Sequence, residues 1–93
     1  MGRGAREKPE RLGAKLLQIR NALELSQDGM ARLLARGKLT RNEISKYERA
    51  VREPSLLVLL RYARIAGVLV DELLDDDLDL PKKLGQSRPR KRK

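Results

Sequence analysis

Five polar side chains recur at spacings of three and four residues in the middle of the chain, and their types suit hydrogen bonding rather than covalent chemistry. They are Arg41, Asn42, Ser45, Lys46 and Arg49. On a helix these positions share one face, away from the apolar Ile44 and Tyr47. Arg can bind guanine O6 and N7 with two hydrogen bonds, and Asn can do the same on adenine. A solvated helix carries similar residues, so the pattern alone leaves solvation open beside the reading of duplex DNA.

The composition narrows the classes of function. The 93 residues include 22 Lys and Arg against 13 Asp and Glu, a net charge of +9 that favours a polyanionic partner. The absence of Cys and His removes thiol chemistry and the commonest general base. We therefore expect no enzyme, no cofactor and no metal site. Tyr47 and Tyr62 are the only aromatic residues, which disfavours the single-strand and RNA-binding modules that stack bases on aromatic side chains.

The chain length and the distribution of charge predict one small domain with basic tails. Residues 1–8 are expected to form a flexible basic arm, residues 9–80 the folded domain, and residues 81–93 a disordered basic tail. The acidic run Asp75 to Asp77 is interpreted as a solvated helix end or a loose partner of the tail. No apolar run approaches the roughly 18 residues of a membrane span, and no signal peptide opens the chain. A cytoplasmic, nucleoid-associated protein without a membrane partner is predicted.

Apolar residues at spacings of three and four predict five short helices, and no segment alternates as a strand does. The first helix is expected to begin near Pro9, whose missing N–H suits a first turn. The second begins after Ser26, a favourable N-cap. Gly37 can end the second helix in the left-handed conformation. The fifth helix covers about residues 70–74.

The third and fourth helices have the clearest boundaries. Thr40 and Glu43 form the capping-box pattern, in which each side chain binds the other residue's backbone N–H. This pattern predicts a helix over about residues 41–49. The fourth helix is predicted over residues 56–66 and stops at Gly67.

Several linked motifs then resemble one family. They are Leu25-Ser26-Gln27, Met30-Ala31, the stretch from Thr40 to Arg49, Arg52-Glu53-Pro54-Ser55-Leu56, and Asp71-Glu72-Leu73-Leu74. Together they resemble the Cro/cI-type (XRE) helix-turn-helix family over about residues 10–74. The resemblance implies an all-α, five-helix, phage-repressor-like domain whose third helix enters the major groove. It also implies a homodimer on a palindromic operator, with half-sites about 34–36 Å apart.

The resemblance assigns roles to individual residues. Base reading falls to the first two turns of the third helix, at Arg41, Asn42, Ser45 and Lys46. Phosphate binding is expected from the helix starts and the nearby basic residues; these are Ser26, Gln27, Lys38, Thr40, Arg49 and Arg52. Arg20 and Glu48 match a family pair that ties the first helix to the third, and we expect a buried structural ion pair there.

The chain departs from the family pattern in the turn before the third helix and at two helix ends. The turn, residues 35–39, is about three residues longer than usual, which leaves the bases reached open. Glu24 and Ala50 stand where the family usually places the glycines that end the first and third helices. If the backbone is left-handed there, each costs on the order of 1 kcal/mol.

The fourth helix is unusually apolar, with five consecutive aliphatic residues from Leu56 to Leu60. A helix cannot bury five consecutive side chains on one face. Leu57, Val58 and Leu69 are therefore predicted to form a dimer interface.

The sequence favours a sequence-specific binder of double-stranded DNA, a transcriptional regulator that represses by occupying its operator. Two alternatives stay open. An antitoxin would bind its own promoter and cover a toxin partner with another surface, and a general RNA or chromatin-like binder would depend on the basic tails.

Overall fold

Five helices and no strand make up the part of the chain that the structure, a computed structural model, describes, residues 8–35 and 37–84. In chain order they are α1 (Leu12–Ala22), α2 (Gln27–Ala35), α3 (Arg41–Glu48), α4 (Leu56–Ala66) and α5 (Val70–Leu74). The predicted all-α, five-helix fold is confirmed. The arm over residues 1–7, Arg36, and the tail over residues 85–93 lie outside the described residues.

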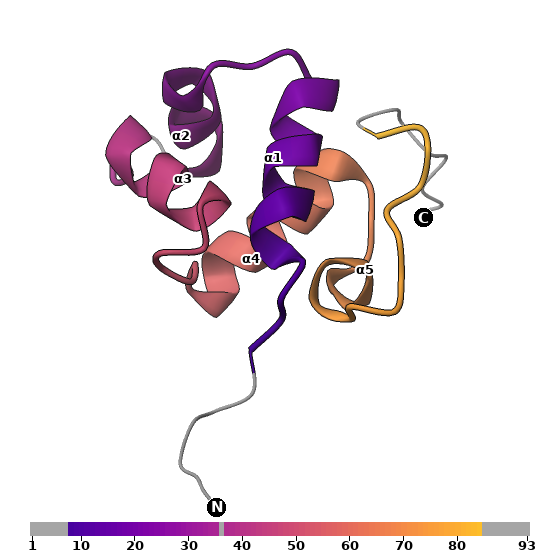
Figure 1. Ribbon diagram of the computed structural model, residues 1–93. Coiled ribbons are helices and arrows are strands. Elements are labelled where there is room, and N and C mark those ends of the chain that lie inside the picture. The colour runs from indigo at the N-terminus through magenta and orange to yellow at the C-terminus, as the bar shows by residue number, and fades with distance from the viewer. Residues whose placement is uncertain (1–7, 36, 85–93) are drawn as a thin grey trace, which may run out of the picture.

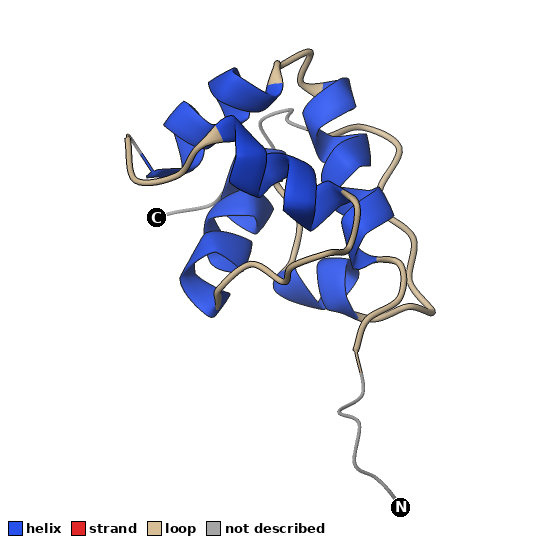
Figure 2. Ribbon diagram, turned by 60° about the vertical axis from the view of Figure 1, so that its left-hand side comes forward, coloured by secondary structure: helices blue, strands red, loops and turns tan. Residues whose placement is uncertain are grey.

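Helix α1 lies at the centre of the arrangement. It contacts α3 on one side and α5 on another, while α2 packs against both α3 and α4. In Figure 1, α2 and α3 lie to the left of α1 and α5 to its right, with α4 behind; Figure 2 shows the same bundle turned. Helix α3, which is predicted to read DNA bases, therefore lies on a different side of the molecule from the acidic α5.

The core is built from the apolar stripes of all five helices. Its most deeply buried large side chains are Leu16, Ile19, Met30, Ile44, Tyr62 and Leu73. None of the helices described here is both long and apolar enough to cross a bilayer.

Helix α1 begins at Leu12, so the prediction of a start near Pro9 was wrong. The physical reason is a distant cap. The Asp76 carboxylate accepts hydrogen bonds from the backbone N–H of Glu10 at 2.8 Å and of Arg11 at 2.9 Å. These bonds satisfy two backbone N–H groups just before the first turn, as a helix cap does, and the helix runs from Leu12. The interpretation of the acidic run as a solvated end was therefore wrong for Asp76, although Asp75 and Asp77 are exposed.

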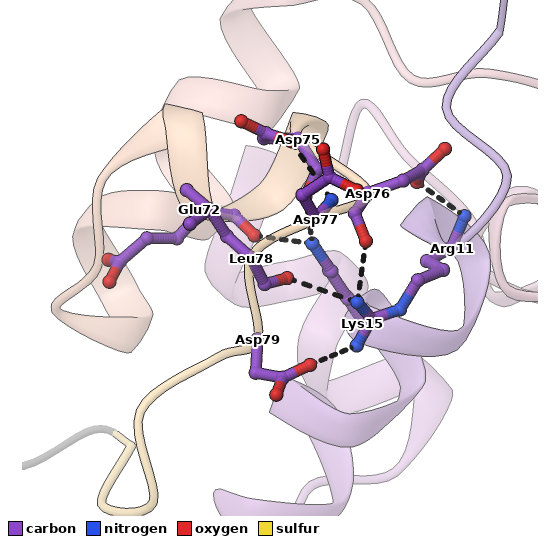
Figure 3. A network of polar contacts seen from close by, with 8 residues as sticks. All are labelled: Arg11, Lys15, Glu72, Asp75, Asp76, Asp77, Leu78 and Asp79. Carbon is purple, nitrogen blue, oxygen red and sulfur yellow. Dashed lines mark hydrogen bonds and ion pairs between the residues drawn. The ribbon is translucent and has the colours of Figure 1, made fainter.

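Two cations at the start of α1 bind α5 and the segment that follows it. Arg11 donates from Nη1 to the Asp76 carbonyl at 2.7 Å and pairs through Nη2 with the Asp79 carboxylate at 2.6 Å. Lys15, only 1% exposed, donates from Nζ to the carbonyls of Glu72 and Asp75 at 2.7 and 2.8 Å. Figure 3 shows both side chains reaching this segment. An ammonium group at the last carbonyls of a helix is favourable, so Lys15 caps α5.

Burial lowers the pKa of Lys15 from its ordinary value, and the nearby Arg11 charge acts in the same direction.

The chain beyond α5 also adds to the core: Leu80 is buried and Leu84 packs against the core while half-buried. The folded contacts thus extend past residue 80, where the sequence placed the domain edge.

The loss of the Asp76 charge should destabilise the fold in acid. Its two backbone hydrogen bonds hold the pKa of Asp76 below its ordinary value of 3.8. A depressed folded-state pKa gives stability that is present above the unfolded pKa and lost as pH falls through the folded one. Urea midpoints measured at pH 7 and pH 3 should therefore differ less in Asp76→Asn than in the unmodified chain. Asp77→Asn is the control, and equal pH dependence in all three proteins would contradict the prediction.

Glu24 and Ala50 adopt the left-handed conformation, with φ of 59° and 61°. Two hydrogen bonds close each preceding helix. After α1, the Leu25 N–H donates to the Arg20 carbonyl and the Glu24 N–H to the Asn21 carbonyl; after α3, the Val51 N–H donates to the Lys46 carbonyl and the Ala50 N–H to the Tyr47 carbonyl. This is the Schellman arrangement, in which glycine is the residue without a steric cost.

Glycine should therefore stabilise the fold at both positions. Glu24→Gly and Ala50→Gly should each raise the melting temperature by roughly 4–8 °C, since about 1 kcal/mol of left-handed strain is relieved. Circular dichroism at 222 nm measures the transition. An unchanged or lower value in both variants would show that the strain is absorbed elsewhere.

Candidate nucleic-acid interface

Helix α3 is fixed at its start and along its inner face. The Glu43 N–H donates to Thr40 Oγ1 at 3.4 Å, and the Thr40 N–H donates to Glu43 Oε1 at 3.0 Å. The predicted capping box is present. Ile44 and Tyr47 are buried, so they anchor the inner face in the core. These contacts hold the backbone that carries the base-reading candidates.

The outer face of α3 presents most of the residues predicted to read bases. Arg41, Asn42 and Lys46 are exposed, on the first two turns of the helix. Ser45 is half-buried, and its Oγ accepts a hydrogen bond from Arg49 Nε at 3.1 Å. The structure thus leaves three long side chains accessible and directs Ser45 toward Arg49.

Five of the six residues predicted to bind phosphate fall into two groups. Ser26 and Thr40 use their hydroxyl oxygens as helix caps; Ser26 Oγ accepts the Gly29 N–H at 2.9 Å. Lys38, Arg49 and Arg52 are exposed basic residues near the ends of α3. The first group fixes the helix starts, while the second supplies positive charge that would attract the phosphates of a nucleic acid.

Gln27, the sixth of these residues, is attached to a buried ion pair. Arg20 binds Glu48 through two bonds, Nε to Oε2 at 2.7 Å and Nη2 to Oε1 at 3.1 Å. Their side chains are 17% and 5% exposed, so the pair stands largely out of water. Gln27 Nε2 donates to Glu48 Oε1 at 3.1 Å, and Arg20 Nη1 donates to the Leu25 carbonyl at 3.0 Å. The hydrogen bond to Glu48 raises the pKa of Arg20.

This network ties three helices together, because its side chains come from α1, α2 and α3. The sequence indicated the Arg20–Glu48 pair but gave no sign that Gln27 joins it. An amide nitrogen has two N–H donors, so Gln27 keeps one beyond its bond to Glu48. The start of α2 and the end of α3 are thus held in one orientation.

The long turn between α2 and α3 is braced from α4. Gly37 has a φ of 85°, and the Lys38 N–H donates to the Ala35 carbonyl at 2.6 Å. Arg61, on α4, donates from Nη1 to the Leu34 carbonyl at 2.9 Å. Arg61 therefore satisfies a carbonyl at the end of α2, a role for which the sequence gave no signal.

The residues predicted for a dimer interface do not all lie on the surface. Leu57 and Leu69 are 54% and 66% exposed, but Val58 is 8% exposed and belongs to the core. The prediction was wrong for Val58, because the helical turn directs it inward with Leu59. Leu56, which the sequence did not single out, is 81% exposed.

Within residues 8–35 and 37–84 no group of Asp, Glu, His or Cys side chains could hold a metal ion.

Comparisons with known proteins agree with this geometry. Residues 16–73 match the family model HTH_3, described as helix-turn-helix. A solved structure of the P22 c2 repressor protein, in complex with synthetic operator 9T in the presence of Tl+, has a TM-score of 0.63 to this fold. The two are 24% identical, and the likeness covers 71% of this chain and 96% of the repressor chain. No curated protein matches the sequence.

Proposed function

This chain belongs to the Cro/cI-type (XRE) helix-turn-helix family, and from that premise we propose that it regulates transcription by binding a specific sequence in double-stranded DNA. One observation carries the proposal most directly: α3 is buried on one face and presents Arg41, Asn42 and Lys46 on the other. Arg and Asn are the side chains that read guanine and adenine edges through two hydrogen bonds.

In the proposed complex α3 lies in the major groove. Arg41 and Asn42 contact the first bases, and Lys46 reaches the next base or a phosphate one turn later. Ser45 contributes a single contact next to Arg49. The P22 c2 repressor, solved with operator DNA, supports this placement through its similar fold.

Phosphate contacts flank the reading helix. Ser26 and Thr40 stand at the starts of α2 and α3, where backbone N–H groups and helix dipoles favour an anion. Lys38, Arg49 and Arg52 add positive charge around them. Such contacts fix the register of the protein on the duplex and make binding weaken as salt rises.

We expect the binding unit to be a homodimer on a palindromic operator. The exposed leucines on and after α4, among them Leu57 and Leu69, supply apolar surface for it. Bound near a promoter, the dimer would repress by occupying the operator. The same leucines would suit a toxin partner, which is the alternative function as an antitoxin.

Selection from a random duplex library at about 150 mM salt tests the proposal. The unmodified chain should enrich a palindromic motif, and the variant Arg41→Ala/Asn42→Ala/Lys46→Ala should not. The control is Arg32→Ala/Arg64→Ala, which removes two exposed positive charges from other helices and should still enrich the motif. If the unmodified chain and the triple variant bind equally without sequence preference, the affinity comes from the tails and the proposal is wrong.

A further inference from the structure

Gly13, in the first turn of α1, faces the backbone at the end of α3. A Cβ atom at this position would lie 2.8 Å from the Glu48 carbonyl oxygen, 3.0 Å from that of Tyr47 and 3.3 Å from the Ala50 nitrogen. All three neighbours are backbone atoms, so no side-chain rotation can make room. The two helices approach this closely only because residue 13 has no side chain.

Helix α1 cannot move away from α3 to admit a methyl group. Arg11 and Lys15 project from the opposite side of α1, since each is two residues from Gly13 and a helix turns about 100° per residue. Arg11 is bonded to the segment after α5, and Lys15, which is fully buried, is bonded to α5 and to Asp75 just after it. Figure 3 shows this attachment. A collision at Gly13 must therefore displace α3.

A second attachment decides how α3 would move. Glu48 is bound through its carboxylate to Arg20, which lies seven residues, or about 10 Å, further along α1. If the contact at Gly13 is pushed apart while the Arg20 contact holds, α3 rotates about that ion pair. Its N-terminal turn, with Arg41 and Asn42, lies about 10 Å from Glu48 and moves with it.

We infer that Gly13 is a positioning residue for DNA recognition: it fixes the angle at which α3 presents Arg41 and Asn42 to the bases. This inference rests on the proposed function and deepens it. Two-point hydrogen bonds to base edges depend on placement within about 0.5 Å, whereas attraction to phosphates does not. Gly13 therefore acts on sequence discrimination and leaves general affinity for DNA intact.

The test compares Gly13→Ala with Gly29→Ala, a second glycine in a helix. At Gly29 the nearest neighbours of an added Cβ are side-chain atoms, Ser26 Oγ at 3.3 Å and Leu25 Cδ2 at 3.4 Å, which can shift. The probes are the duplex selected by the unmodified chain and a shuffled duplex of equal length. In Gly13→Ala, affinity for the selected duplex should fall about tenfold or more, while affinity for the shuffled duplex stays within about twofold. Gly29→Ala should keep both.

Binding is measured at a temperature where circular dichroism shows each variant folded. If Gly13→Ala does not fold, the same comparison is made in a background carrying Glu24→Gly, a stabilising change at the far end of α1. The inference is overturned if a folded variant discriminates normally, if both affinities fall together, or if no folded form exists.

The outcome for the proposed function is separate. If the unmodified chain selects no motif, the proposed function fails and the inference falls with it. If Gly13→Ala reads the selected motif as well as the unmodified chain does, only the inference fails.

Discussion

Replacing Glu48 with Gln should lower the melting temperature by about 12 °C or more. The substitution keeps the size of the side chain and removes its charge, which leaves the Arg20 guanidinium largely out of water without a counter-ion. Removing one partner of a buried ion pair costs roughly 3–5 kcal/mol. In a domain of this size about 1 kcal/mol corresponds to 4–8 °C. Gln27 also exchanges a charged acceptor for a neutral one.

Thermal unfolding followed by circular dichroism at 222 nm measures the effect. Glu24→Gln is the matched control, because Glu24 is exposed and the same charge is removed from the end of α1. Its melting temperature should stay within about 2 °C of that of the unmodified chain, because surface substitutions usually change the free energy of unfolding by no more than about 0.5 kcal/mol. If Glu48→Gln has the same melting temperature as the control, the charged pair stabilises the fold no more than its neutral form does.

Leu57→Glu combined with Leu69→Glu should produce a monomer with little affinity for the operator. Two carboxylates on the leucine surface would have to be buried without partners in a dimer, which is unfavourable. Light scattering should report a mass of 10.6 kDa, half the mass expected for the proposed dimer of the unmodified chain. Because linked half-sites add avidity of 10²–10⁴, affinity for the palindromic duplex should fall by about 100-fold or more.

The control for this prediction is Leu33→Glu with Leu78→Glu, two exposed leucines outside the proposed interface. It should remain dimeric. An unchanged mass in Leu57→Glu/Leu69→Glu would place the interface elsewhere. An unmodified chain that is monomeric and co-purifies with a small protein through these leucines would favour the antitoxin function.

The parts of the fold that could be predicted from sequence are those governed by local contacts. The Thr40–Glu43 capping box and the left-handed Gly67 set the boundaries of α3 and α4 within a few residues of the signal itself. The resemblance, rather than any local signal, singled out Glu24 and Ala50 as helix-end positions where a glycine is usual, and both are left-handed. The capping signals at α3 and α4 are of a different kind. Such signals need only neighbouring residues and are present in the linear sequence.

The remainder depends on residues far apart in the chain. Asp76 caps a helix that begins more than 60 residues earlier, and Lys15 reaches carbonyls near the other end of the domain. No spacing rule links such partners, so the acidic run appeared solvated. The same holds for Arg61 beneath the long turn. Val58 was misplaced for a related reason: a fully apolar run does not show which side faces the core until α4 is packed.

Arg11, Gly13 and Lys15 lie outside the stretch, residues 16–73, that matches the family model, and so do Asp75 and Asp76, whose carbonyls Lys15 and Arg11 bind. The shared stretch carries α3, the proposed base-reading helix, and on our inference the flanking contacts would help to set its angle through Gly13. Transplanting residues 16–73 between relatives would therefore transfer the base-contacting side chains but not the contacts that set the orientation of α3. On the same inference, divergence in these flanks would change operator preference while every base-contacting residue stays the same.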